Sequence, residues 1–254
     1  MSRPVAVVTG SSSGIGAACA LRFARGGFDV ALNCSRDPKP AEYVAEQCRA
    51  AGAQTEIVVA DISQDADCKR FAARVLERWG SARALVNNAG RTKFVGLRDF
   101  DGLSAQDFQD IYAVNTIGAF QMARAFAPLL VKEQGASIVN VSSIAAVMGL
   151  GSSIAYMCSK GALNTLTIAL ARALGPQIRV NGVGPGMIEG EWLKQGYGAE
   201  RYEAMGAAWR NQAALSSTIP PEDVAETVFF LATGAPKTTG ETLLVDAGFK
   251  IGKG

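Results

Sequence analysis

A short apolar run, a glycine-rich turn and a helix open this chain, and this arrangement constrains its fold more than any other feature. Residues 4–8 have the pattern of a buried strand, and residues 17–26 have helical apolar spacing that ends at glycine. Between them, Gly10, Gly14 and Gly16 permit a tight turn and let a pyrophosphate approach the free N–H groups of the helix. We therefore expect a dinucleotide-binding unit at the N-terminus.

Strand-like and helix-like segments alternate along the rest of the chain. The further candidate strands are residues 29–34, 55–60, 84–87, 137–141, 177–183 and 242–245, and the candidate helices are residues 40–51, 63–79, 104–134, a segment around Tyr156, and 221–233. The long helix 104–134 is interrupted near residues 115–118. With 254 residues, 48% of them hydrophobic, the chain suits one large α/β domain, residues 1–254.

Composition excludes several classes of function. The net charge is +2 and the basic residues are scattered, so we expect no nucleic-acid or membrane surface. No apolar run is long enough to span a bilayer and no signal-peptide pattern is present, which predicts a cytoplasmic protein. The five cysteines are widely spaced and suit reduced thiols. Histidine is absent, which rules out histidine triads and histidine-ligated metals, and we expect no metal site.

Tyr156 and Lys160 form the candidate acid/base pair. They are four residues apart in a helical stretch, so their side chains share one face. A cation about 4 Å from the phenol, at an effective dielectric of about 20, is worth roughly 4 kcal/mol, or at most about three pKa units. We therefore expect Lys160 to lower the pKa of Tyr156 toward neutrality. The pair alone also occurs by chance on helix surfaces.

Two further polar residues fit the same chemistry. Ser143 follows the apolar run 137–141, where a hydroxyl at a strand end can donate to a carbonyl oxygen that is becoming an alkoxide, although serines there also form turns. Asn115 lies inside the long helical stretch, where a buried amide needs a partner, and we expect it to hold a bound water.

The end of the second strand decides the cofactor. Dinucleotide folds use an acidic residue there for the ribose of NAD, or a basic one for the extra phosphate of NADP. Here Ser35 is followed by Arg36, whose forked donors match a phosphate, so we expect NADP. Asp37 leaves NAD as the alternative, and a solvated loop arginine is the plain alternative for Arg36.

Later strand ends complete the expected cofactor cleft. Asp61 can accept a hydrogen bond from an adenine with Ile62 packed on the ring, or it can cap the next helix. Asn88 follows the fourth strand, at the edge where open α/β sheets bind ligands. Residues 187–217 are less regular and aromatic, which is typical either of a substrate lid or of helices packed on the core.

The motifs together resemble the short-chain dehydrogenase/reductase family over essentially the whole chain. They are Thr9-Gly10-x-x-x-Gly14-Ile15-Gly16, Asn87-Asn88-Ala89-Gly90, Asn115, Ser143, Tyr156-x-x-x-Lys160, Pro185-Gly186, Thr239-Gly240 and Asp246-Ala247-Gly248. The resemblance implies a doubly wound Rossmann domain with a seven-stranded parallel sheet and helices on both faces. The subgroup that the chain is most similar to is the 3-oxoacyl-carrier-protein reductases.

By this resemblance, Tyr156 is the acid/base, Lys160 lowers its pKa and holds the nicotinamide ribose, Ser143 polarises the carbonyl and Asn115 fixes a water. The expected cofactor-binding residues are Gly10, Ser12, Ser13, Gly14, Ile15, Gly16, Ser35, Arg36, Asp61, Ile62, Asn88, Ala89, Gly90, Tyr156, Lys160, Pro185, Gly186 and Ile188. The resemblance also implies a homotetramer built through the long helices.

The chain departs from the family pattern at three places. Ser13 stands where many NADP-using members have a basic residue, Met187 stands where a threonine is frequent, and residues 91–102 are longer and more charged than usual. We expect hydride transfer between NADP(H) and a carbonyl/secondary alcohol pair, with a 3-oxoacyl thioester as one substrate class. The alternatives are an NAD-dependent sugar or polyol dehydrogenase and a catalytically silent nucleotide-binding regulator.

Overall fold

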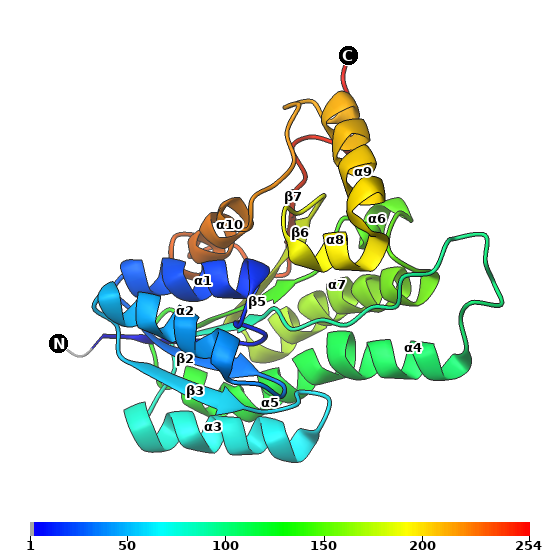
Figure 1. Ribbon diagram of the computed structural model, residues 1–254. Coiled ribbons are helices and arrows are strands. Elements are labelled where there is room, and N and C mark those ends of the chain that lie inside the picture. Colours follow the sequence, from blue (N-terminus) through cyan, green and yellow to red (C-terminus); the bar gives the residue numbers. More distant parts are fainter. Residues whose placement is uncertain (1–2) are drawn as a thin grey trace.

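The computed structural model describes residues 3–254 and contains one seven-stranded, fully parallel sheet (Figure 1). The strands are, in chain order, β1 Val5–Val8, β2 Asp29–Cys34, β3 Thr55–Val59, β4 Ala84–Asn87, β5 Ser137–Val141, β6 Arg179–Pro185 and β7 Thr242–Val245. Their order across the sheet is β3-β2-β1-β4-β5-β6-β7. The predicted doubly wound Rossmann fold is therefore confirmed.

The strand order places the ligand-binding crevice. The chain starts with β1 near the middle of the sheet, builds β2 and β3 on one side, and then builds β4 to β7 on the other. β1 pairs in parallel with both β2 and β4. Ligands bind outside the carboxyl ends of the strands where the winding reverses, so the crevice lies beyond the ends of β1 and β4.

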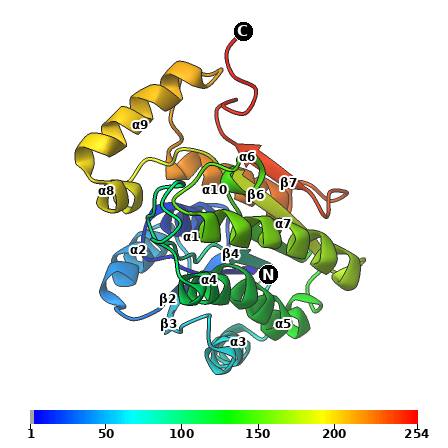
Figure 2. The ribbon, with the colours of Figure 1, turned by 90° about the vertical axis from the view of Figure 1, so that its right-hand side faces the viewer.

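Helices cover both faces of the sheet (Figure 2). One face carries α1 Gly14–Arg25, α2 Lys39–Ala50 and α10 Pro221–Thr233, and the other carries α3 Asp65–Trp79, α5 Ala119–Leu130 and α7 Ile154–Leu174. Each layer buries its own hydrophobic core. In β1, Ala6 and Val8 belong to the first core, whereas Val5 and Val7 belong to the second, as the two-residue strand period requires.

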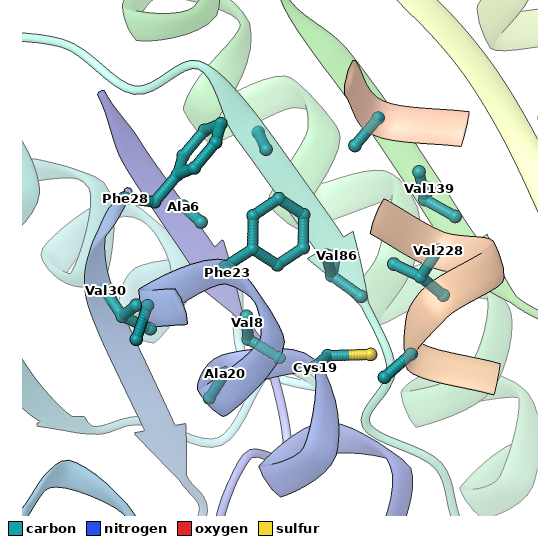
Figure 3. Close-up of a cluster of buried hydrophobic side chains, with 14 of the residues drawn as sticks. Ala6, Val8, Cys19, Ala20, Phe23, Phe28, Val30, Val86, Val139 and Val228 are labelled. Carbon is teal, nitrogen blue, oxygen red and sulfur yellow. The ribbon is translucent and has the colours of Figure 1, made fainter. Parts of the chain in front are cut away.

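Phe23 anchors the core beneath α1 (Figure 3). Its ring meets Phe28 edge-on at 5.1 Å and Phe229 of α10 at 5.2 Å between centroids. Val30 and Val86 of the sheet belong to the same cluster. This packing fixes α1, and with it the glycine turn before α1, against the sheet.

The long helix expected over residues 104–134 consists of three parts. α4 spans Ala105–Tyr112, a π-helical turn η1 spans Ala113–Gly118, and α5 spans Ala119–Leu130. The predicted interruption therefore takes the form of a wider helical turn, and the helical stretch ends at Leu130, earlier than expected. Such π-helical turns occur frequently at functional sites.

The segment 187–217, for which we expect either a substrate lid or helices packed on the core, contains two helices, α8 Glu191–Tyr197 and α9 Ala199–Gln212. A short helix α6 Ala145–Met148 follows β5. α9 extends away from the sheet (Figure 1), and Gly206 is its one buried residue. Its end is held by Trp209, which stacks on Phe249 with ring centroids 3.7 Å apart. Among the helices described, none has the length and hydropathy required to cross a bilayer.

Candidate active site

Ser143, Tyr156 and Lys160 come together beyond the end of β5. Ser143 follows the strand, and its Oγ accepts a hydrogen bond from the N–H of Ala145 at 3.1 Å. α7 begins beside it, where the Ser153 hydroxyl caps the helix by accepting from the Tyr156 N–H at 3.3 Å. Tyr156 therefore lies in the first turn of α7, and Lys160 lies one turn later on the same face, as predicted.

Burial dominates the acidity of the Tyr156 phenol. It raises the pKa of Tyr156 to about 12, and interaction with the Ser143 hydroxyl offsets only part of this rise. The nearby Tyr197 raises the pKa further. The pKa of Tyr156 is therefore raised, not lowered as expected, because desolvation makes the largest contribution and Lys160 is not among the groups that shift this pKa. At neutral pH the phenol keeps its proton.

Lys160 is buried, and its ammonium is directed to the backbone. Its Nζ donates to the carbonyl oxygen of Val141, the last residue of β5, at 2.8 Å and lies 5.7 Å from the centroid of the Tyr156 ring. Burial lowers the pKa of Lys160 to about 8. A buried amine with a pKa close to neutrality exchanges protons far more readily than an exposed lysine does.

The Asn115 side chain joins two parts of the site. Its Oδ1 accepts from the Arg91 N–H at 2.7 Å, and its Nδ2 donates to the Arg91 carbonyl at 3.0 Å and to the Ser159 hydroxyl at 2.9 Å. A Cβ added at Gly90 would lie 3.5 Å from this Oδ1 and 3.8 Å from Lys160 Nζ, so Gly90, Asn115 and Lys160 lie close together. The amide is occupied by protein partners, and its expected role in holding a water remains a prediction.

The glycine turn has the shape that a bound pyrophosphate needs. Gly10 and Gly14 have φ of +60° and +53°, in the left-handed region that favours glycine. A Cβ at Gly16 would lie 2.2 Å from the Gly10 carbonyl oxygen, so only glycine fits. Asn88 fixes the turn, because its Nδ2 donates to the carbonyls of Thr9 and Gly10 at 3.0 Å each. These residues fit the nicotinamide dinucleotide that the fold implies.

Three residues that hold this turn were not among the predicted site residues. Thr9 Oγ1 accepts the N–H groups of Asn88 and Ala89, at 2.9 Å and 3.0 Å. Asn33 Oδ1 accepts the Gly10 N–H at 3.2 Å, and Ser11 Oγ accepts the Asn33 N–H at 2.9 Å. The available signal was Asn33 itself, a polar residue in an apolar strand, which requires buried partners.

The adenine side of the crevice is more open. Ser35 and Arg36 follow β2 and are exposed, and so is Asp37. Asp61 Oδ1 accepts both the N–H and the hydroxyl of Ser63, at 3.0 and 2.7 Å, so one of its oxygens shapes the turn before α3. Ile62 is buried against Gly118 of η1. Contact of these residues with a cofactor remains a prediction.

The opposite wall of the crevice comes from the segment after β6. Pro185 ends that strand, and a Cβ at Gly186 would lie 2.4 Å from the Trp209 ring. Ile188 pairs with Ile219 in an isolated bridge. These contacts direct the chain into α8, whose Trp192 ring lies 6.3 Å from the Tyr156 ring.

Comparison with known proteins agrees with this geometry. A family model described as enoyl-(acyl carrier protein) reductase matches residues 10–250. A crystal structure of a short-chain dehydrogenase/reductase from Burkholderia xenovorans superposes with a TM-score of 0.92 at 42% identity, over 99% of this chain and 100% of that one. The chain belongs to the short-chain dehydrogenase/reductase family. Its resemblance to the 3-oxoacyl-carrier-protein reductases is also confirmed.

Two relatives of this short-chain dehydrogenase/reductase have names that refer to ketoacyl reduction. Ketoacyl reductase 2 of the granaticin polyketide synthase from Streptomyces violaceoruber is 40% identical over 96% of this chain and 95% of its own. The 3-oxoacyl-[acyl-carrier-protein] reductase FabG of Staphylococcus epidermidis is 31% identical over 96% of this chain and 97% of its own. Members of the family are oxidoreductases that bind a nicotinamide cofactor and act on small molecules, and this chain is such an oxidoreductase.

Proposed function

We propose that this protein reduces a carbonyl group to a secondary alcohol with NADPH, and that 3-oxoacyl thioesters are among its substrates. The observation that carries the proposal is the position of the Tyr156 phenol, which faces the Ser143 hydroxyl beside the buried Lys160. The ketoacyl reductase relatives support the substrate class.

Each side chain has a distinct task in this proposal. A bound nicotinamide supplies the hydride. Ser143 donates a hydrogen bond to the carbonyl oxygen as negative charge develops there. Tyr156 then delivers its proton to that oxygen, and its pKa of about 12 keeps the proton in place until the oxygen becomes basic. Lys160, with its pKa lowered to about 8, returns a proton toward the phenolate.

Replacement of Tyr156 tests the mechanism. Tyr156→Phe removes the transferable proton and keeps the ring, so kcat should fall by about 10²- to 10⁴-fold while NADPH affinity changes little. Tyr43→Phe is the matched control, because Tyr43 is 65% exposed on α2. Absorbance at the NADPH band measures turnover, and substantial activity in Tyr156→Phe would exclude this mechanism.

Arg36 supports the proposed preference for NADP, because it is exposed two residues after the end of β2 and has no acidic partner within ion-pair distance in the described chain. Arg36→Ala should weaken NADPH binding by about tenfold or more and leave NADH binding unchanged. Equal affinities for both cofactors in both proteins would favour the alternative, an NAD-dependent sugar or polyol dehydrogenase.

The quaternary structure and location that we propose are a homotetramer in the cytoplasm. Exposed apolar side chains on neighbouring helices support the tetramer, among them Phe120 of α5 and Ile168 of α7, at 41% and 49% exposed. Free thiols at all five cysteines support the location. Light scattering after size exclusion measures the assembly, and a monomeric mass would refute it.

We also propose that residues 187–217 act as a lid over the substrate. α8 approaches Tyr156 through Trp192, while α9 buries one residue, so this segment has few contacts to lose on opening. Hydrogen exchange should be faster in α8 and α9 than in α7, and substrate should slow exchange in α8.

A further inference from the structure

Three aromatic side chains from two distant parts of the chain gather beside the Tyr156 phenol. Phe94 comes from the loop after β4, and Trp192 and Tyr197 come from α8. The Phe94 ring lies 4.7 Å from that of Tyr197 and 5.8 Å from that of Trp192, both edge-on. We call these three residues the aromatic wall.

The aromatic wall is adjacent to the reacting group. Trp192 lies 6.3 Å from the Tyr156 ring, measured between centroids, and is 51% exposed. Tyr197 is close enough to raise the pKa of Tyr156. A half-exposed indole beside the proton donor presents a large apolar surface to whatever carbonyl compound reaches that donor.

The packing of the wall depends on a glycine. A Cβ at Gly196 would lie 2.1 Å from the Phe94 ring, so α8 can approach this ring because residue 196 has no side chain. The loop of residues 91–102, which carries Phe94, is bound to Ser152. The Val95 N–H donates to the Ser152 carbonyl at 2.8 Å, and the hydroxyls of Thr92 and Ser152 are 2.6 Å apart. These hydrogen bonds hold the loop that carries Phe94 in place.

Two charged residues of the loop that carries Phe94 are paired with carboxylates of α4. Lys93 Nζ contacts Asp107 at 2.8 Å, and the Arg91 guanidinium contacts Asp110 at 3.1 Å. The guanidinium of Arg201 lies over the Tyr197 ring, 4.9 Å from its centroid. A sugar or polyol needs several free donors and acceptors close to the reacting carbon. The wall offers aromatic surface instead.

We infer that the substrate carries a flat, uncharged ring next to its carbonyl group, and that Trp192 selects this ring. The inference rests on the proposed carbonyl reduction and specifies its substrate class as aryl or fused-ring ketones. Stacking or edge contact with an indole favours binding of an aromatic ring over a saturated ring of the same size by about two- to tenfold, beyond the effect of area burial.

A matched pair of 3-oxo esters tests the inference. Ethyl 3-oxo-3-phenylpropanoate and ethyl 3-cyclohexyl-3-oxopropanoate differ only in whether the ring is aromatic. The ratio of their kcat/KM values is measured in wild type, Trp192→Leu and Trp192→Phe. Because intrinsic reactivity cancels between variants, a change in this ratio reports the wall alone.

In Trp192→Leu the phenyl-to-cyclohexyl ratio should fall by about two- to tenfold, mainly through KM, and in Trp192→Phe it should fall less. Tyr43→Leu, on exposed α2, is the control and should leave the ratio unchanged. An unchanged ratio in Trp192→Leu, or turnover of other ketones without turnover of ethyl 3-oxo-3-phenylpropanoate, would overturn the inference.

A second measurement separates the inference from the proposed function. Ethyl 3-oxo-3-phenylpropanoate should quench tryptophan fluorescence in wild type, and this quenching should be lost in Trp192→Phe, which keeps Trp79 and Trp209. Quenching without reduction of any carbonyl compound would refute the proposed function and retain the aryl site. Reduction of carbonyl compounds without quenching that depends on Trp192 would support the proposed function and refute the aryl site.

Discussion

The two sides of the crevice are built in different ways. The cofactor side is the glycine turn after β1, where Asn88, Thr9 and Asn33 satisfy one another and the backbone through buried or part-buried hydrogen bonds. The side proposed to bind substrate is formed by α8 and α9, where Trp192 and Tyr197 contact Phe94 edge-on and Gly206 is the one buried residue.

This difference separates a rigid function from a variable one. A pyrophosphate is chemically constant, so a turn with fixed backbone N–H groups and no space for a Cβ can bind it. Substrate shape varies, and a wall of ring contacts can change without disturbing the sheet. Substitutions should therefore affect global stability on the first side and substrate handling on the second.

Gly16→Ala should have the largest effect on stability. The added methyl group would meet the Gly10 carbonyl at 2.2 Å, a backbone atom that cannot move without breaking the turn. We expect a loss of about 3 kcal/mol in the free energy of unfolding, measured with urea, together with weaker cofactor binding. A fully stable Gly16→Ala protein would contradict the description of this turn as rigid.

Lys160, on α7, makes the stability of the folded protein depend on pH. Its pKa is about 8 in the folded protein and 10.5 for an ordinary lysine, so the unfolded chain binds more protons between these values. The free energy of unfolding should therefore rise as the pH increases from 8 to 10.5. Relative to Lys160→Met, this rise should reach about 3 kcal/mol. If the free energy of unfolding, measured with urea, depended on pH in the same way in both proteins, the amine would not be desolvated.

Gly196→Ala should have the smallest effect on stability. The new methyl group meets the Phe94 ring at 2.1 Å, but a side chain on a surface loop can rotate away. We expect less than about 1 kcal/mol of destabilisation and a several-fold rise in KM for ethyl 3-oxo-3-phenylpropanoate. If this variant unfolds as readily as Gly16→Ala, the two sides do not differ in rigidity.

The sequence predicted the fold because its signals are local. Apolar runs of four to seven residues, such as residues 137–141, have few alternatives to a buried strand when helices separate them. The spacing of Tyr156 and Lys160 also fixed their common helix face. The glycines of the first turn were recognised because their conformational role leaves a clear pattern.

The missed features depend on contacts between distant segments. The pKa of Tyr156 is set by burial, which sequence spacing does not report. Phe94 reaches Trp192 across almost one hundred positions of the chain, and no local pattern encodes that contact. For residues 187–217 the sequence left a substrate lid and helices packed on the core as alternatives, and it could not choose between them because α9 has no clear apolar face.

The π-helical turn η1 links the two ends of the crevice mechanically. At one end, Gly118 packs on Ile62, beside the expected adenine position, and at the other, Asn115 holds Arg91 and Ser159. The six residues Ala113–Gly118 thus contact both ends of the crevice. A redesign of the proposed adenine site that displaces Ile62 should also shift the Asn115 amide, which contacts Ser159 of α7. We therefore expect cofactor preference and turnover to change together at this position.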